Sequence, residues 1–232
     1  MSHCAFGKLS YVDSVQNSVL HRKVEPELLD SLPPDDLRAV RSRRELRWIN
    51  ALMGNERWIL QQLKKHRPYL TGTIVEWGAG EGKLCQKIRR DFPQHEVTGV
   101  DFLSNPFTPQ HQISWRQGNL LQMDPHKDDS IVVANLFLHH LTEEELLSLK
   151  PWLIQAKWLI MSEPLRKKGS HFWGKLLHPV LHDVTRHDMH VSIDAGFVPG
   201  ELSKLWAELH DSWLVEEWEQ WPGAYRSVWR RK

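Results

Sequence analysis

Glycines and a carboxylate are spaced for ligand binding in segment 74–82, which has the sequence Ile-Val-Glu-Trp-Gly-Ala-Gly-Glu-Gly. The glycines, beginning with Gly78 and Gly80, would let the backbone approach a ligand without a Cβ in the way. A dinucleotide site would need another glycine at position 83, where the chain has Lys83. Glu76 instead supplies a carboxylate, which attracts a cationic amino group and repels a pyrophosphate. The segment therefore favours S-adenosylmethionine, which is cationic and carries no phosphate.

Two adjacent histidines, His139 and His140, follow an apolar stretch that ends near Asn135. An imidazole titrates close to neutral pH and can take up a phenolic or enolic proton. Thr142 and Glu145 have the spacing of a capping box, which would start the next helix and leave His139 outside it. We expect His139, with His140 as the second candidate, to be catalytic; the other interpretation is that both are capping or core residues.

Five further histidines cluster between residues 171 and 190, and His178 and His182 have the i, i+4 spacing of a metal site. A zinc protease motif would need Glu after the first histidine, and Pro179 stands there. We therefore expect a surface or lid helix and no metal site. The histidines concerned are His171, His178, His182, His187 and His190.

From residue 72 onward, short apolar runs alternate with longer amphipathic segments. Such alternation predicts an α/β, doubly wound, mostly parallel and Rossmann-like sheet covered by helices on both faces. A closing hairpin is expected from residues 200–209 and 213–219. Strands are expected at 73–77, 96–100, 113–116, 131–135 and 158–161, and helices at 83–90, 142–153 and 186–195.

The first third of the chain has a different pattern. Prolines and acidic residues at 33–36 predict a helix start, and Gly54 predicts its end. Asn55 is expected to cap a second helix that ends at Pro68. Residues 1–68 would then form a helical cap and residues 69–232 the main domain, with an inserted segment at about 164–190 completing a lid.

Composition narrows the classes of protein. The 232 residues carry a net charge of +1 and two cysteines, too few for a disulfide framework. The chain has no apolar run of the ~20 residues that a membrane span needs and no secretory signal pattern, so a cytoplasmic protein is expected. Nine Lys/Arg against two carboxylates in residues 37–67 indicate either a solvated helix face or a footprint for a polyanion.

Residues from about 70 to 200 resemble a class I S-adenosylmethionine-dependent methyltransferase of the small-molecule type. Matching segments occur in the family's order at 76–82, 97–101, 117–120, 133–141 and 195–197. The resemblance implies a seven-stranded sheet, ribose binding by the acid that ends the second strand, and adenine binding by the third segment. It implies as cofactor-binding residues Glu76, Gly78, Gly80, Asp101, Phe102, Gly118, Asn119, Leu120, Asn135 and Leu136.

Two positions depart from the usual family pattern. Asn119 replaces the common Asp of the adenine loop, and its amide oxygen can still accept a hydrogen bond. Asn135 stands where Asp or Ser is commoner. Neither departure removes a group that the cofactor requires.

The expected function is methyl transfer to the O or C atom of a small aromatic, polyketide-like or quinone-like acceptor. An RNA methyltransferase that uses the basic hairpin is an alternative, although Leu136 and Phe137 replace the proline pair of the amino-methylating signature. A silent cofactor-binding protein is another. A NAD-dependent oxidoreductase is disfavoured by Lys83. The sequence leaves the oligomeric state open.

Overall fold

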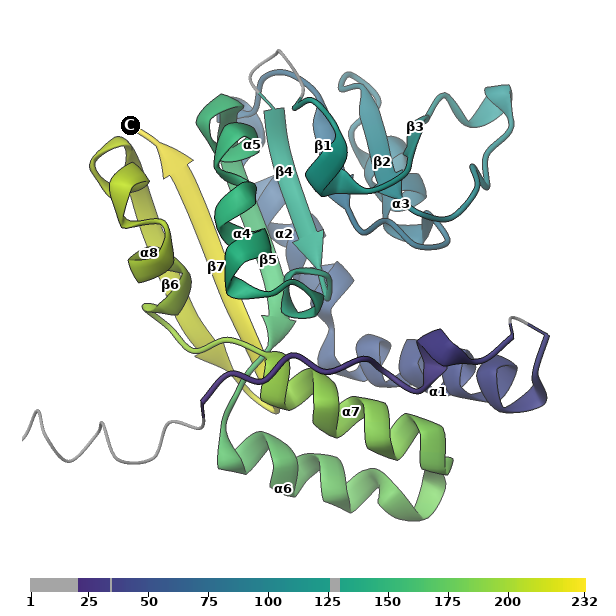
Figure 1. Ribbon diagram of the computed structural model, residues 1–232. Coiled ribbons are helices and arrows are strands. Elements are labelled where there is room, and N and C mark those ends of the chain that lie inside the picture. The colour runs from purple at the N-terminus through teal and green to yellow at the C-terminus, as the bar shows by residue number, and fades with distance from the viewer. Residues whose placement is uncertain (1–20, 34, 126–129) are drawn as a thin grey trace, which may run out of the picture.

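The computed structural model describes residues 21–33, 35–125 and 130–232 (Figure 1). One seven-stranded sheet has the order β3-β2-β1-β4-β5-β7-β6, with β7 antiparallel to its neighbours and the other adjacent pairs parallel. The strands are β1 (Ile74–Trp77), β2 (Val97–Asp101), β3 (Ser114–Gln117), β4 (Ser130–Asn135), β5 (Ala156–Pro164), β6 (Trp213–Gln220) and β7 (Ala224–Arg231). The helices are α1 (Leu37–Met53), α2 (Asn55–His66), α3 (Lys83–Asp91), α4 (Glu143–Ser148), α5 (Lys150–Gln155), α6 (Lys168–Leu177), α7 (Asp183–Ala195) and α8 (Glu201–Leu205).

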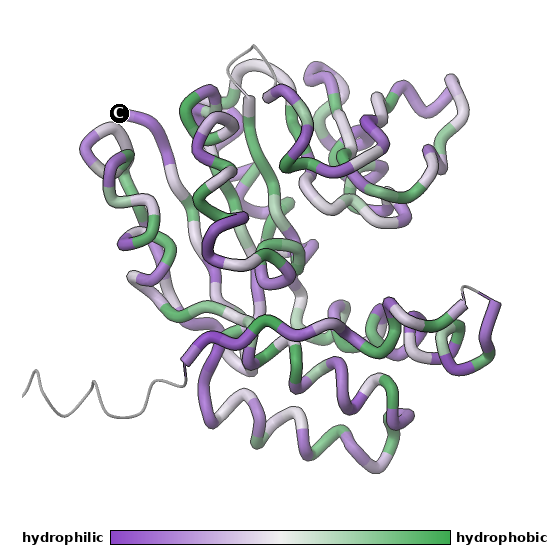
Figure 2. The backbone as a smooth tube through the Cα atoms, viewed as in Figure 1, coloured by the Kyte–Doolittle hydropathy of each residue, from purple (hydrophilic) through white to green (hydrophobic). Residues whose placement is uncertain are grey.

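The central strands bury apolar residues on both faces, as expected for strands covered by helices on each side. Figure 2 shows β4 as a largely hydrophobic segment. Alternate residues belong to two core clusters. Val75 and Trp77 of β1 pack on the face covered by α4, α5 and α8. Ile74 of the same strand packs on the face covered by α2 and α3. The predicted doubly wound α/β fold is confirmed.

The strand order changes direction at β1: β2 and β3 follow on one side of it, and β4 and β5 follow on the other side. Helices after β1 and β4 therefore cover opposite faces, and the chain leaves a crevice at the carboxyl ends of these strands. In Figure 1 the arrow of β4 points toward α1 and α7.

Helix α1 leaves the sheet and packs on α7. Ile49 contributes to a small core cluster with Leu181, Met189 and Ile193. Helix α1 begins where the Asp36 side chain accepts the amide of Arg38, and it ends at Gly54, whose φ of 65° is left-handed. Figure 1 shows α1, α6 and α7 together beneath the carboxyl ends of β4 and β5.

Three sequence expectations about elements were wrong. Residues 200–209 form α8 and a following 3₁₀ turn rather than a strand, because Leu202 and Trp206 are buried at helical spacing. The closing hairpin is β6 with β7. The predicted helix 142–153 is divided into α4 and α5 near Pro151, which lacks an amide hydrogen.

Asn55 does not cap α2. Gly54 occupies the N-cap position itself, so that Asn55 is the first helical residue, and its buried amide side chain has no hydrogen-bond partner among the described residues. Within the described part of the chain, no helix combines the length and apolar character needed to cross a bilayer.

Candidate active site

Two cavities meet at the carboxyl end of β4. The first has a volume of about 500 Å³ and the second about 450 Å³. Leu136 and His140 line both. A ligand in one cavity can therefore approach a ligand in the other through the loop that follows β4.

The first cavity collects most of the residues that the sequence predicted for the cofactor. Among the predicted residues, Glu76, Gly80 and Asn135 do not line it. The predicted residues that do are Gly78, Asp101, Phe102, Gly118, Asn119, Leu120 and Leu136, with His140 at the junction.

Asp101 ends β2 and holds the glycine turn by its carboxylate. Its Oδ2 accepts the amide of Gly80 at 2.7 Å, and its Oδ1 accepts the amide of Leu103 at 2.9 Å. An ionised carboxylate has about four lone-pair sites. Two of them remain for hydroxyl donors of a ligand in the first cavity.

Residue 78 of the turn after β1 must be a glycine for two reasons. Its φ is 65°, and a Cβ built there would lie 2.2 Å from the ring of Phe137. Gly80 has a φ of 54°, but a Cβ there would meet nothing within 4 Å. The turn after β1 and the loop after β4 are therefore in direct contact.

Glu76 is 4% exposed and turned toward α3. The thiol of Cys85 donates to its Oε2, with 2.9 Å between sulfur and oxygen. Burial raises the pKa of Glu76 to about 8, because desolvation penalises the charged form. Burial also raises the pKa of the Cys85 thiol. The Glu76 side chain therefore joins β1 to α3, the two elements on either side of the glycine turn.

The end of β4 carries an unsatisfied polar atom and an unusual backbone conformation. Oδ1 of Asn135 is buried and has no hydrogen-bond partner among the described residues. Leu136 has a φ of 55°, which is uncommon for a residue with a Cβ. Such features concentrate at ligand-binding sites. Asn119 begins a 3₁₀ turn, in which its Oδ1 accepts the amide of Leu121 at 2.9 Å.

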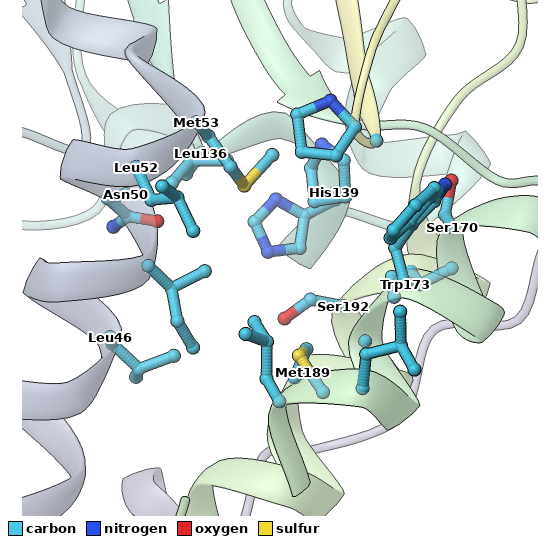
Figure 3. A pocket seen from close by; sticks show the side chains of 18 of the residues that line it. Leu46, Asn50, Leu52, Met53, Leu136, His139, Ser170, Trp173, Met189 and Ser192 are labelled. Atoms are coloured by element: carbon cyan, nitrogen blue, oxygen red, sulfur yellow. The ribbon is translucent and has the colours of Figure 1, made fainter. Parts of the chain in front are cut away.

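The second cavity is mainly apolar and lies between α1, α6 and α7. Figure 3 shows Leu46, Asn50 and Met53 facing Met189 and Ser192 across it, with His139 at one end. The exposed aromatic side chains of Trp173 and Trp221 lie at 5.5 Å between ring centroids and complete its wall. A largely apolar wall with a few polar groups suits a small aromatic molecule.

His139 is 4% exposed and is oriented by Glu163, the penultimate residue of β5. Its Nδ1 lies 2.8 Å from Oε2 of Glu163. Oε1 of Glu163 also accepts the backbone amides of Phe137 and Leu138 at 3.0 and 2.9 Å. An Nδ1–H donated to Glu163 leaves Nε2 of the neutral ring as a hydrogen-bond acceptor.

His140 stacks beside His139, with 4.1 Å between ring centroids. Burial and the neighbouring His139 lower the pKa of His140. Ligand atoms of Glu27, His139 and His140 all lie within 4.8 Å of one another, so these three residues could also hold a divalent cation. The sequence predicted no metal site at these positions.

A segment that the sequence left uninterpreted also reaches the site. We call residues 22–32 the N-terminal strap; in Figure 1 it runs alongside α7 toward α1. Arg22 donates to the carbonyl oxygens of Leu141 and Ala195 at 2.6 and 2.9 Å. Glu27 lines the second cavity and Asp30 the first. No periodic pattern in the sequence could have placed the strap here, because its contacts are to residues more than a hundred positions away.

Histidines of α6, of the 3₁₀ turn that follows it and of α7 form a chain of ring contacts. Nδ1 of His171 lies 2.8 Å from Nδ1 of His190, whose Nε2 lies 2.9 Å from Nε2 of His178. His171 also contacts Asp194 at 2.9 Å. These contacts tie α6 to α7 beside the second cavity.

Solved structures share the fold of this chain. The plantazolicin methyltransferase BamL, in complex with a triazolic desmethylPZN analog and SAH, matches with a TM-score of 0.67 at 12% identity over 88% of this chain and 92% of its own. The plantazolicin methyltransferase BpumL, in complex with the same analog and SAH, gives 0.66 at 11% identity over 88% and 93%. This chain therefore has the fold of these SAH-bound methyltransferases.

The same methyltransferase fold occurs in the methyltransferase domain of bacterial CtHen1, with a TM-score of 0.54 at 14% identity over 77% of this chain and 99% of that domain. No family model matches the sequence. No curated protein matches it either. The predicted seven-stranded methyltransferase architecture with an antiparallel closing hairpin is confirmed.

Proposed function

We propose that this protein transfers a methyl group from S-adenosylmethionine to the O or C atom of a small aromatic, polyketide-like or quinone-like acceptor. The main observation that supports this proposal is that the two cavities meet at Leu136 and His140. One cavity offers polar groups for a nucleoside and the other an apolar space for an acceptor. Direct displacement needs this end-to-end placement of donor and acceptor.

The first cavity fits the cofactor. Asp101 keeps lone pairs for the ribose hydroxyls, and Asn119 borders the position proposed for the adenine. Gly78 lets the backbone approach, and Phe102, Gly118, Leu120 and Leu136 supply further walls. The bound cofactor supplies an electrophilic methyl group. Glu76 holds the turn through Cys85.

The protein's own groups position the acceptor and remove its proton. The walls from α1, α6 and α7 exclude water, so we assign residues 34–67 and 164–190 a lid role. For a hydroxyl acceptor, Nε2 of His139 takes the proton, and Glu163 stabilises the resulting imidazolium through Nδ1–H. His140 borders both ligands. A nucleophilic carbon or an ionised phenolate needs no base, and His139 then orients the acceptor.

Isothermal titration with S-adenosylhomocysteine and NADH tests the cofactor assignment. We expect S-adenosylhomocysteine to bind with a dissociation constant in the micromolar range, which is a binding free energy of about −8 kcal/mol at 1 μM. We expect NADH not to bind. Mass spectrometry of ligands that co-purify with the protein then identifies acceptor candidates for a methyl-transfer assay. Binding of the nucleoside without turnover of any acceptor would favour a silent cofactor-binding protein.

Methylation of RNA is the second candidate, and the charge pattern weakens it. Much of the basic excess of residues 37–67 is paired with carboxylates of the chain. These ion pairs include Arg38–Asp36, Arg41–Glu45, Arg47–Glu81 and Lys64–Asp91. We expect any RNA binding to disappear between about 50 and 200 mM salt. Site-specific methylation of a defined RNA at physiological salt would contradict the small-acceptor proposal.

We also propose a cytoplasmic location, and a division into a helical cap at 1–68 and a methyltransferase domain at 69–232. Residues 1–20 of that cap lie outside the described residues. The buried free thiol of Cys85 fits a reducing compartment. Core residues of α2 pack directly on the sheet, so the cap is continuous with the main core.

A further inference from the structure

Glu27 of the N-terminal strap and His139 lie face to face in the second cavity. Oε1 of Glu27 is 3.9 Å from Nε2 of His139, and the side chains are 10% and 4% exposed. This distance is too long for a direct hydrogen bond. With Nδ1–H donated to Glu163, Nε2 is an acceptor, as is the Glu27 carboxylate. Two hydrogen-bond acceptors therefore border one gap.

The strap holds Glu27 in this position by contacts on both sides of it. The amides of Leu28 and Leu29 donate to the buried carboxylate of Asp188 at 2.7 and 3.0 Å. The amide of Lys23 donates to the carbonyl of Asp194 at 3.1 Å. Ser192 donates its hydroxyl to Oε1 of Glu27. Glu27 is thus fixed before any acceptor arrives, which reduces the entropy lost on binding.

A ligand with a single hydroxyl would donate to only one of these acceptors. Either Nε2 of His139 would gain no donor, or Oε1 of Glu27 would keep only the hydroxyl of Ser192. An unsatisfied buried acceptor is costly, and more so when it is charged. Two hydroxyls on one ring satisfy both: one hydrogen-bonds to His139 and the other to Glu27. The apolar side chains of Met53, Trp173 and Met189 surround the remaining space and suit the faces and edges of a ring.

We propose that Glu27 binds a second hydroxyl of the acceptor, so that the acceptor is an aromatic compound with at least two hydroxyl groups. The hydroxyl at His139 loses its proton and receives the methyl group, while the hydroxyl at Glu27 stays protonated and anchors the ring. This inference rests on the proposed function and narrows its acceptor class. Glu27 is a specificity residue in this scheme, and His139 remains the proton acceptor.

The test uses the full chain saturated with S-adenosylhomocysteine and titrated with alpha-naphthol or its meta-dihydroxy analogue. A charge-assisted hydrogen bond is worth about ten- to a hundredfold in affinity. We expect the dihydroxy compound to bind about ten- to a hundredfold more tightly than the monohydroxy compound. Glu27→Gln should remove most of this preference, with little change for alpha-naphthol.

Glu25→Gln is the matched control, because Glu25 lies on the same strap, is exposed and pairs with Lys23. It should keep the full preference. If Glu27→Gln fails to fold by its thermal transition, Glu27→Asp serves instead, since it keeps the charge and retracts the carboxylate from the gap. Equal affinities of wild type for the two naphthols would overturn the proposal, as would an unchanged preference in the Glu27 variant.

Two further titrations separate competing explanations. Naphthylmethylamine carries an ammonium with several donors; tighter binding of this amine than of the diol would overturn the hydroxyl assignment. Micromolar binding of Zn²⁺ that is lost in Glu27→Gln would make Glu27, His139 and His140 a metal site and overturn the proposal. If S-adenosylhomocysteine itself fails to bind, the proposed function fails; if it binds and the diol preference is absent, only this inference fails.

Discussion

Nδ1 of His139 lies 2.8 Å from the carboxylate of Glu163, which joins the loop after β4 to the end of the adjacent strand β5. The same carboxylate accepts three backbone amides of that loop, those of Phe137, Leu138 and His139. One buried acid therefore sets both the path of the loop and the tautomer of the imidazole. It fixes the direction of Nε2 relative to the second cavity.

The first prediction concerns this pair. We expect His139→Ala to lower turnover by about 10²–10⁴ and to leave affinity for S-adenosylhomocysteine nearly intact. A general base acts only in its unprotonated form, so a base makes the rate depend on pH, and the variant should lose that dependence. Glu163→Gln should reduce turnover in the same direction, because it removes the charge that stabilises the imidazolium.

Steady-state kinetics over a pH series, combined with isothermal titration, check these outcomes. A loss of less than about fivefold with an unchanged pH profile would reject the base role. The methyltransferase proposal would remain, with His139 as an orienting residue.

The second prediction concerns cofactor affinity. Asp101→Ala removes a carboxylate that would hydrogen-bond both ribose hydroxyls, and each such bond is worth about 1.5–3 kcal/mol. Affinity for S-adenosylhomocysteine should fall at least tenfold in isothermal titration. Asp183→Ala is the control, because the side chain of Asp183 is 88% exposed and lies at the start of α7. Unchanged affinity in Asp101→Ala would exclude ribose binding by this residue.

The third prediction compares two glycines of one turn. Alanine at Gly80 has space but must adopt a left-handed φ, which costs about 1–2 kcal/mol. Alanine at Gly78 has the same backbone cost and also collides with Phe137. Urea denaturation should show a loss larger by about 1–3 kcal/mol for Gly78→Ala. The Gly78→Ala substitution should also weaken S-adenosylhomocysteine binding, since Phe137 lines the first cavity. Equal losses of stability in the two variants would contradict the contact between residue 78 and Phe137.

The fourth prediction concerns pH and stability. Burial raises the pKa of Glu76 to about 8, so the folded state retains a proton that the unfolded state releases above its usual value of 4.5. The free energy of unfolding contributed by this group must therefore fall as pH rises between these two values. The full effect is about 5 kcal/mol at most.

Glu76→Gln cannot ionise and should lose this slope. Urea denaturation of wild type and variant near pH 6 and pH 9 measures the difference. We expect the variant to gain stability relative to wild type at the higher pH. A constant difference across the pH range would show that Glu76 is not protonated in the folded protein.

The sequence by itself determined the doubly wound sheet, and it predicted the turn at Gly78 and the acid Asp101 as parts of the binding site. These features depend on local signals, because apolar runs define the strands and one βα unit separates the turn from the acid. The adjacent order of β1 and β2 then follows from the topology, and the structure places both residues at one cavity.

Local signals failed where two interpretations of a short segment were similar in strength. Residues 200–209 have apolar residues compatible with a strand, and only burial of Leu202 and Trp206 against the sheet made them a helix and turn. Asn55 is a common capping residue, but Gly54 already occupies the cap position between two helices. Glu76 was expected beside the ligand, whereas the structure pairs it with Cys85 under α3.

Only the tertiary structure decided the composition of the second cavity. Glu27 and His139 are far apart in the chain, and the gap between them exists because the strap is fixed along α7 by Asp188 and Asp194. No spacing or periodicity encodes such a contact, since it depends on how separate elements pack. The chain's own pattern therefore specifies the sheet that carries the proposed methyltransferase site, and long-range packing specifies which side chains surround the proposed acceptor cavity.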